Sequence, residues 1–371
     1  MSSSMPTAKL QEGDKRAGFT VSSVTPLPEL RAVAYLLAHE KSGAHLLHLH
    51  NEDPENLFTV AFRTPPPDST GLPHILEHTV LCGSKKYPVK DPFVELLKKS
   101  VATFLNAMTY PDKTVYPCAS MNEKDFFNIT DVYCDAVFHP LIAEKHFKQE
   151  GHHLDFAEPG NPKSPLTIKG IVYNEMKGAK SSPDQLMARS LWNALYPDTT
   201  YQYNSGGEPA DIPMLTHDTL RRFHQQHYHP SNAFFYTYGD LPLEDHLAFI
   251  HDKILGFFTA VDPKTEVPSQ KRWKDPRNAT YVYPLDPGDD PAKKSQACVA
   301  WLCADIKDTF EVLVLKLLEQ ILLGNAASPL RKALIDSELG SSMADVTGFD
   351  ADNRDTLFAC GLKDVDPEDA G

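Results

Sequence analysis

The 371-residue sequence predicts an α+β protein in which an antiparallel sheet is flanked by helices. Three observations support this fold class. The first part of the chain is rich in short strand-forming runs, segments with helical periodicity and capping residues follow, and the order of strand and helix restarts near the end. We therefore expect one complete domain followed by an incomplete second domain of similar fold.

The expected strands are runs of β-branched, aromatic and aliphatic residues bounded by turn residues. A Lys-Ser-Gly turn at 41–43 joins the second strand to the third, and a Tyr-Pro-Asp-Lys turn at 110–113 joins the fifth to the sixth. Pro117 is expected to place the sixth strand at a sheet edge or to end it, because proline donates no backbone hydrogen bond. The strands cover 19–24, 32–39, 44–50, 57–62, 103–109, 114–119, 231–239 and 296–304.

The expected helices combine a capping residue or an early proline with apolar residues three and four positions apart. The clearest is the long helix at 309–323. A helix over 166–178 is expected from the apolar side formed by Ile168, Ile171, Val172 and Met176. The remaining helices are expected near 73–82, 91–97, 125–137, 144–150, 183–195, 216–227 and 242–258.

Prolines recur among charged residues in the stretch 261–292, which indicates a linker between domains. The linker divides the chain into a first domain at 19–260 and the start of a truncated second domain at 293–371. Residues 1–18 contain no apolar core and are expected to be disordered. They resemble neither a secretory signal nor a good mitochondrial presequence.

Composition excludes several classes of protein. The formal net charge is −14, from 36 basic and 50 acidic residues, which argues against nucleic acid as the main partner. No apolar run reaches the roughly 20 residues of a membrane-spanning helix. The six cysteines are scattered without a Cys-x-x-Cys pair, which favours reduced thiols over disulfides or a cysteine zinc site.

The main chemical signal is the pattern His-x-x-Glu-His at residues 74–78. On a helix, His74 and His78 project from one face and can hold one metal ion. Glu77 lies beside them, where its carboxylate can take a proton from a metal-bound water. A pattern this short also arises by chance, but two histidines and a glutamate on a short apolar helix need partners, since burying them alone costs several kcal/mol.

Other histidines and a nearby cysteine are interpreted structurally. His45, His48 and His50 are expected to be exposed or packed polar residues of a strand, with His48 and His50 on the same face. The cluster of His224, His227 and His229 is interpreted as a solvated helix end. Cys82, four residues after His78, is interpreted as a packed thiol.

Several ordered segments resemble the presequence protease branch of the pitrilysin metallopeptidases. The resemblance extends from about Gly18 to the end of the chain. The segments that carry it are 64–71, running into 74–78, then 81–93, 103–109, 149–151 and 170–178.

The resemblance implies a zinc site with one ion per chain. Its ligands would be His74, His78 and Glu175, and Glu77 would be the general base. Asn106 and Ala107 would contact a substrate peptide that adds to the sheet edge as a strand. A hydrophobic pocket beside the metal would be formed by Leu81, Phe93, Val94 and Leu97, with Val94 smaller than the aromatic residue expected there.

The function implied by the resemblance is a zinc endopeptidase that degrades unstructured peptides, such as cleaved targeting sequences. Two alternatives remain: a non-catalytic peptide-binding or scaffold relative, and an inactive fragment. The family's C-terminal half supplies an Arg and a Tyr that stabilise the oxyanion, and we expect that half to be missing here. The resemblance suggests the mitochondrial matrix, whereas the visible N-terminus leaves the cytoplasm as the alternative.

Overall fold

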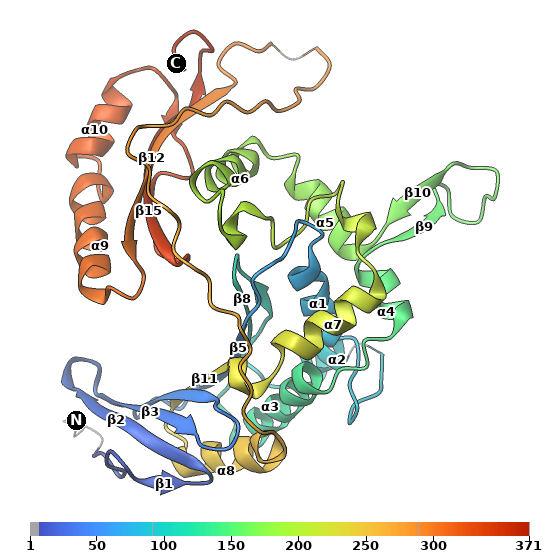
Figure 1. Ribbon diagram of the computed structural model, residues 1–371, viewed down its shortest axis with the longest axis vertical. Coiled ribbons are helices and arrows are strands. Elements are labelled where there is room, and N and C mark those ends of the chain that lie inside the picture. The colour runs from blue at the N-terminus through green and yellow to red at the C-terminus, as the bar shows by residue number, and fades with distance from the viewer. Residues whose placement is uncertain (1–6, 91, 289, 371) are drawn as a thin grey trace. The chain divides into compact units, whose positions relative to one another are not determined.

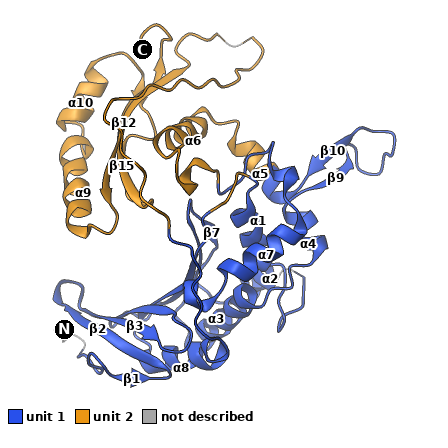
Figure 2. Cartoon of the chain, in the orientation of Figure 1, with its two compact units in different colours: residues 1–65, 70–173, 205–266 blue, residues 66–69, 174–204, 267–371 orange. Residues whose placement is uncertain are grey.

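A computed structural model describes residues 7–90, 92–288 and 290–370 (Figure 1). The chain divides into two compact units (Figure 2). Unit 1 consists of residues up to 65, 70–173 and 205–266, and unit 2 consists of 66–69, 174–204 and the residues from 267 onward. Both units combine sheets with helices, which confirms the predicted α+β class.

Unit 1 is built on a nine-stranded sheet with the order β1-β2-β3-β4-β11-β5-β8-β6, and β7 also pairs with β8. All neighbours are antiparallel except β4 and β11, which run parallel. A separate hairpin joins β9 to β10. The strands are Lys15–Arg16 (β1), Phe19–Leu27 (β2), Ala32–His39 (β3), His45–His50 (β4), Asn56–Arg63 (β5), Phe104–Leu105 (β6), Met108–Thr109 (β7), Lys113–Ser120 (β8), His153–Phe156 (β9), Leu166–Lys169 (β10) and Ala233–Gly239 (β11).

The helices outside unit 2 follow the expected positions closely, and Asn122 and Thr216 cap α3 and α7 as their sequence context predicts. The expected cap of α2, Asp91, lies outside the described residues. The helices are Leu72–Val80 (α1), Pro92–Lys99 (α2), Glu123–Phe138 (α3), Glu144–Glu150 (α4), Ile171–Ala179 (α5), His217–His227 (α7) and Leu243–Lys253 (α8), with 3-10 turns at Pro28–Leu30, Ile212–Met214, Pro230–Asn232 and Leu255–Phe257.

The core of unit 1 forms where α3 packs on the central strands. Residues of β5 alternate between buried and half-buried, as a strand with one covered face requires. Phe62 of β5 is fully buried, and its ring contacts those of Tyr116, Phe138 and Tyr228. These contacts join β5, β8, α3 and the end of α7 into one aromatic cluster.

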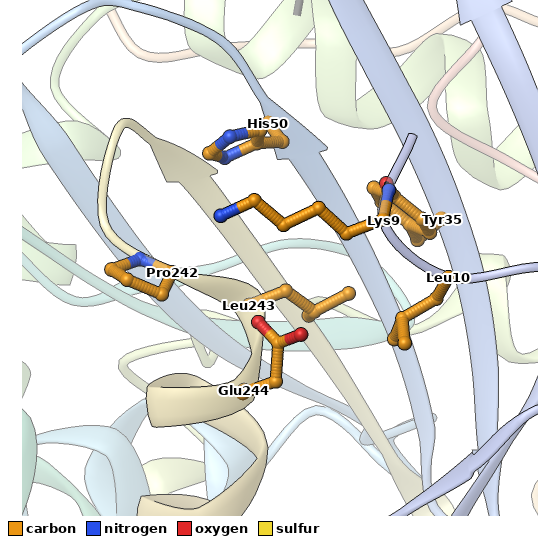
Figure 3. A pocket seen from close by; sticks show the side chains of 7 residues that line it. All are labelled: Lys9, Leu10, Tyr35, His50, Pro242, Leu243 and Glu244. Carbon is orange, nitrogen blue, oxygen red and sulfur yellow. The ribbon is translucent and has the colours of Figure 1, made fainter. Parts of the chain in front are cut away.

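Residues 7–18, which were expected to be disordered, are ordered. Leu10 is buried, the backbone N–H of Lys9 donates to the Tyr35 hydroxyl at 3.0 Å, and β1 pairs with β2. The sequence lacked an apolar run here, but one leucine and strand pairing suffice to fix the segment. Figure 3 shows the Lys9 side chain lying along a small hollow lined by Lys9, Leu10, Tyr35, His50, Pro242, Leu243 and Glu244.

The helix expected over 166–178 begins only at Ile171, which corrects that prediction. Residues 166–169 instead form β10, whose Lys169 Nζ lies 2.9 Å from Asp155 of the partner strand β9. Gly170 marks the change, because a Cβ atom there would lie 2.0 Å from the carbonyl oxygen of Gly151. The apolar spacing in this segment was read with one period where two elements meet.

Pro117 lies inside β8 and not at a sheet edge, which is a second correction. It pairs with Thr59 of β5, and its carbonyl oxygen accepts from the backbone N–H of Asn106 on the opposite side. Because N–H and C=O of one strand residue point the same way, the missing N–H faces the break between β6 and β7. The proline therefore costs the sheet no hydrogen bond at this position.

Unit 2 contains a four-stranded antiparallel sheet with the order β12-β15-β13, and β14 also pairs with β15. Helix α6 covers one face of this sheet, and α9 and α10 lie on the other (Figure 1). The elements are Pro183–Leu195 (α6), a 3-10 turn at Thr200–Gln202, Ser295–Asp305 (β12), Thr309–Leu323 (α9), Pro329–Asp336 (α10), Ser342–Met343 (β13), Gly348–Asp350 (β14) and Asp355–Val365 (β15).

The residues 174–204 belong to unit 2, although the sequence placed them in the first domain with the rest of 19–260. The reason is a buried cluster in which Tyr196 and Tyr201 pack on Leu357 and Ala359 of β15. The Tyr196 hydroxyl also donates to the carbonyl oxygen of Asp355 at 2.7 Å. Described residues between 261 and 292 form neither helix nor strand, and no helix in the described part of the chain is long and apolar enough to cross a membrane.

We expect Phe62→Ala to lower the free energy of unfolding of unit 1 by about 3–5 kcal/mol, because a fully buried ring would leave a cavity among three other rings. Phe234→Ala, on the neighbouring strand and 38% exposed, is the matched control and should cost much less. Urea denaturation followed by circular dichroism measures both. Equal losses for the two variants would contradict the assignment of Phe62 to the core.

Candidate metal centre

Helix α1 starts at a close contact between two glycine-containing segments. Gly71, just before the helix, has φ +71°, and a Cβ atom there would lie 2.8 Å from the carbonyl oxygen of Gly206. Gly207 approaches Gly71 from the other side with the same restriction. Only glycine allows both the left-handed backbone and this approach. The loop at 205–207 is thereby held against the first turn of α1.

The two motif histidines lie one turn apart on α1, and each has an oxygen partner on its Nδ1 atom. The Nδ1 atom of His74 lies 3.2 Å from the carbonyl oxygen of Gly206. The Nδ1 atom of His78 lies 3.1 Å from Oε2 of Glu150. Since a carbonyl and a carboxylate only accept, each Nδ1 carries the proton. The lone pair of each ring is then on Nε2, the tautomer that a metal ligand needs.

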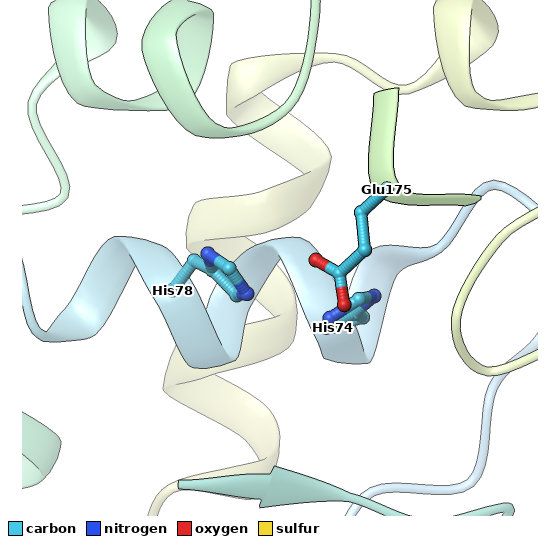
Figure 4. Close-up of side chains that lie close together, drawn as sticks. All are labelled: His74, His78 and Glu175. Atoms are coloured by element: carbon cyan, nitrogen blue, oxygen red, sulfur yellow. The ribbon is translucent and has the colours of Figure 1, made fainter. Parts of the chain in front are cut away.

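Glu175 in α5 completes a group of three with the motif histidines. One ligand atom from each of His74, His78 and Glu175 lies within 4.8 Å of the others. Figure 4 shows the Glu175 carboxylate beside the His74 ring, with His78 one turn further along α1. The histidines are half-buried and Glu175 is exposed. Two imidazole nitrogens and one carboxylate form a donor set suited to zinc.

Glu77 points to the other side of α1, where Thr109 of β7 receives it. The Thr109 hydroxyl donates to Oε2 of Glu77 at 2.7 Å, and Glu77 is only 7% exposed. This hydrogen bond orients a carboxylate that would otherwise be costly to bury. Thr109 belonged to a segment that carried the resemblance, but the sequence analysis gave it no role.

Glu150 is the second residue near the site that sequence reasoning missed. It is buried at the end of α4, and Gln149 Nε2 also donates to it at 2.9 Å. Burial works to raise the pKa of Glu150, but hydrogen bonds from His78, Gln149 and Cys82 outweigh burial and lower its pKa. The carboxylate is therefore a charged acceptor for His78. Glu150 lies 72 positions from His78, so no local spacing could have revealed it.

Asn106 and Ala107 lie between the short strands β6 and β7 at the edge of the sheet. The Tyr133 hydroxyl donates to the carbonyl oxygen of Asn106 at 3.2 Å, and the Asn106 side chain accepts from the N–H of Ala107. These contacts fix the backbone of the edge. Asn106 itself is exposed and Ala107 half-buried.

The four residues expected to form a hydrophobic pocket have different surroundings. Leu81 follows directly after α1 and is half-buried, and the Phe93 ring meets that of Tyr133 edge to face. Val94 and Leu97 of α2 are exposed. A pocket formed by all four therefore remains a prediction.

The histidine cluster after α7 is packed and not solvated, which corrects that interpretation. His227 is 6% exposed, and its Nδ1–H donates to the Phe223 carbonyl. The Nε2–H of His224 donates to the Val137 carbonyl at 2.8 Å, and burial lowers the pKa of His224 to about 4. A helix end that packs on α3 is buried by its neighbours, which sequence position alone does not reveal.

The strand histidines and the cysteines agree with their structural interpretation. His48 is fully buried, its ring stacks near that of His50, and His45 is exposed on the other face. Cys82 is buried, with its thiol 3.4 Å from the His78 carbonyl oxygen. No disulfide joins cysteines in the described parts of the chain.

Comparison with known proteins places these features in a family. Residues 63–156 match the model of the insulinase family, peptidase family M16, and residues 214–369 match the model of the M16 inactive domain. The first match contains His74, Glu77 and His78, whereas Glu175 lies between the two matches.

Curated relatives include the mitochondrial presequence protease of Xenopus tropicalis, 49% identical over 96% of this chain and 35% of that protein. Presequence protease 1 of Arabidopsis thaliana, described as chloroplastic and mitochondrial, is 44% identical over 96% of this chain and 33% of that protein. The chain thus spans about a third of the length of the curated relatives it matches.

Two solved structures share the fold at 17% identity. A protease from Helicobacter pylori aligns with a TM-score of 0.64 over 88% of this chain and 74% of that chain. Pitrilysin aligns with a TM-score of 0.55 over 90% of this chain and 34% of that chain. Taken with the family models and the curated relatives, these likenesses show that the chain belongs to peptidase family M16 and corresponds to about a third of a presequence protease.

Proposed function

We propose that this chain forms the zinc-binding part of a metalloendopeptidase that cleaves unstructured peptides, such as cleaved mitochondrial targeting sequences. The observation that carries the proposal is the group of His74, His78 and Glu175 with Glu77 on the same helix as the histidines. The names of the curated relatives support the substrate class, and their mitochondrial location supports the matrix as the compartment.

His74, His78 and Glu175 would hold one zinc ion. Both histidines have their Nδ1 protons committed to oxygen partners, and Glu175 supplies a single negative ligand, so the residues present fit the metal. Three protein ligands are the number that catalytic zinc sites use. When bound, zinc would polarise the scissile carbonyl and lower the pKa of its water.

Glu77 would act as the general base and then as the acid. Its carboxylate takes the proton of the attacking water and delivers it to the nitrogen of the leaving amine. Thr109 holds Oε2 by its hydroxyl, so the carboxylate keeps one orientation during both transfers. The Arg and Tyr that the resemblance assigns to oxyanion stabilisation would come from the part of the protein outside these residues.

A peptide would bind as an added strand along the edge formed by β6 and β7. Strand addition uses backbone hydrogen bonds, and it requires an extended chain with few demands on its side chains. Asn106 and Ala107 offer that backbone, held from behind by the Tyr133 hydroxyl. Only an unstructured peptide could adopt this conformation, which supports the proposed substrate class.

Replacing the proposed base tests the mechanism. Glu77→Gln should reduce cleavage of an unstructured basic peptide in the presence of zinc by about 10²–10⁴-fold, because the amide cannot accept the proton. Zinc binding should persist, since Glu77 is not among the three proposed ligands. Peptide fragments are measured by mass spectrometry, and zinc by isothermal titration calorimetry.

Glu95→Gln, an exposed change on α2, is the control and should leave cleavage intact. Unchanged cleavage in Glu77→Gln would refute the assigned base. A chain that binds one zinc but cleaves nothing would refute independent activity of these residues. A chain that binds no zinc would favour a non-catalytic relative.

Glu150 should matter for metal affinity although it is not a ligand. Glu150→Gln replaces the charged acceptor of His78 by a neutral one, and we expect zinc affinity to fall by about 10–100-fold. Gln149→Ala keeps the carboxylate and is the matched control. Competition with a chelating dye measures both affinities, and equal affinity in wild type and Glu150→Gln would contradict the role.

A further inference from the structure

Helix α9 of unit 2 is apolar on two opposite sides. Its inner side, with Val312, Leu315 and Leu322, is partly covered, and Glu319 on that side accepts the backbone N–H of Phe349 in β14 at 3.0 Å. The opposite side carries a second apolar stripe at helical spacing. This stripe, the outer face of α9, consists of Phe310, Leu313, Val314, Leu317, Leu318 and Ile321.

The outer face of α9 is unusually exposed for its composition. Phe310 is 74% exposed, Leu317 57% and Ile321 66%. A helix that is apolar all round is normally buried on all sides. Single exposed apolar residues are common, but a contiguous stripe marks a surface that binds something.

The edge strand of the same sheet adds to this surface. β12 is the end strand in the order β12-β15-β13, so among the described residues one of its edges has no strand partner. Its residues Ala300 and Leu302 pack toward α6, whereas Val299 and Trp301 face the side of α9 and are 59% and 51% exposed. An open edge beside exposed apolar side chains is a site where a further strand pairs.

We propose that the outer face of α9, together with Val299 and Trp301, is the seat for further strand and helix elements of the same polypeptide, from the length that the relatives have beyond the part matched here. The curated relatives are about three times as long as the matched stretch, so chain to cover the surface exists in them. The occupant would add a strand to β12 and lay an apolar helix on α9. This inference rests on the family and not on peptidase activity.

The form of the surface favours this occupant over a transient partner. Obligate interfaces resemble a domain core cut in half, with apolar centres and few charges. The outer face of α9 contains six apolar residues in four turns, and Glu319 is turned to the β14 backbone. An edge strand and an apolar helix face are what remains when a layered α+β core is covered on one side only.

The experiment co-expresses tagged residues 1–371 with an untagged polypeptide, the part of the Xenopus tropicalis presequence protease that follows the matched stretch. We expect the two to co-purify in equal amounts. Leu317→Asp and Ile321→Asp should each reduce the captured polypeptide at least tenfold, because a buried carboxylate would face apolar groups. Leu154→Asp is the matched control, since Leu154 is 68% exposed on the β9–β10 hairpin.

Circular dichroism and thermal unfolding show whether each variant stays folded, and two separate positions guard against one that does not. Absence of capture by the wild-type chain would overturn the proposal, as would equal capture by the aspartate variants. Sedimentation of the wild-type chain alone tests a second copy as occupant. A dimer that Leu317→Asp converts to a monomer would also overturn it.

Discussion

The structure of unit 1 depends on the burial of polar groups along one short helix. Helix α1 has nine residues, and most of its other side chains are buried and apolar, yet it carries two histidines and a glutamate. Each of these needs a partner, because an unpaired buried polar group costs several kcal/mol. The partners come from three different places: the loop at 205–207, the end of α4, and β7. The packing of these segments around α1 therefore follows from the chemistry that α1 carries.

Sequence alone predicted those parts that depend on neighbouring residues. The helix that carries His74 and His78 was expected from capping, spacing and the following glycine, and the ends of α9 were predicted to the residue. Helical periodicity and caps are local signals, read within one or two turns. The geometry of the two histidines follows from their separation by four residues, and needs no tertiary information.

The failures have in common that tertiary contacts decided the outcome. Residues 166–169 became a strand because β9 lies beside them, and Pro117 is tolerated inside β8 because the neighbouring edge breaks there. His224 was expected in solvent but is covered by α3. Glu150 and Thr109 could not be chosen from sequence, because their distance along the chain from α1 carries no information about their distance in space.

Glu150 and Glu175 are placed by a single backbone contact. Gly151, which directly follows Glu150, accepts a hydrogen bond role for no side chain; instead its carbonyl oxygen lies where a Cβ atom of Gly170 would be. That approach fixes the turn after β10, and α5 begins at the next residue with Val172 fully buried. Glu175 then follows five residues after Gly170 on a rigid helix. The acceptor for His78 and the acidic member of the three-residue group are thus set by the same glycine pair, so enlarging Gly170 would disturb both carboxylates together without touching either histidine.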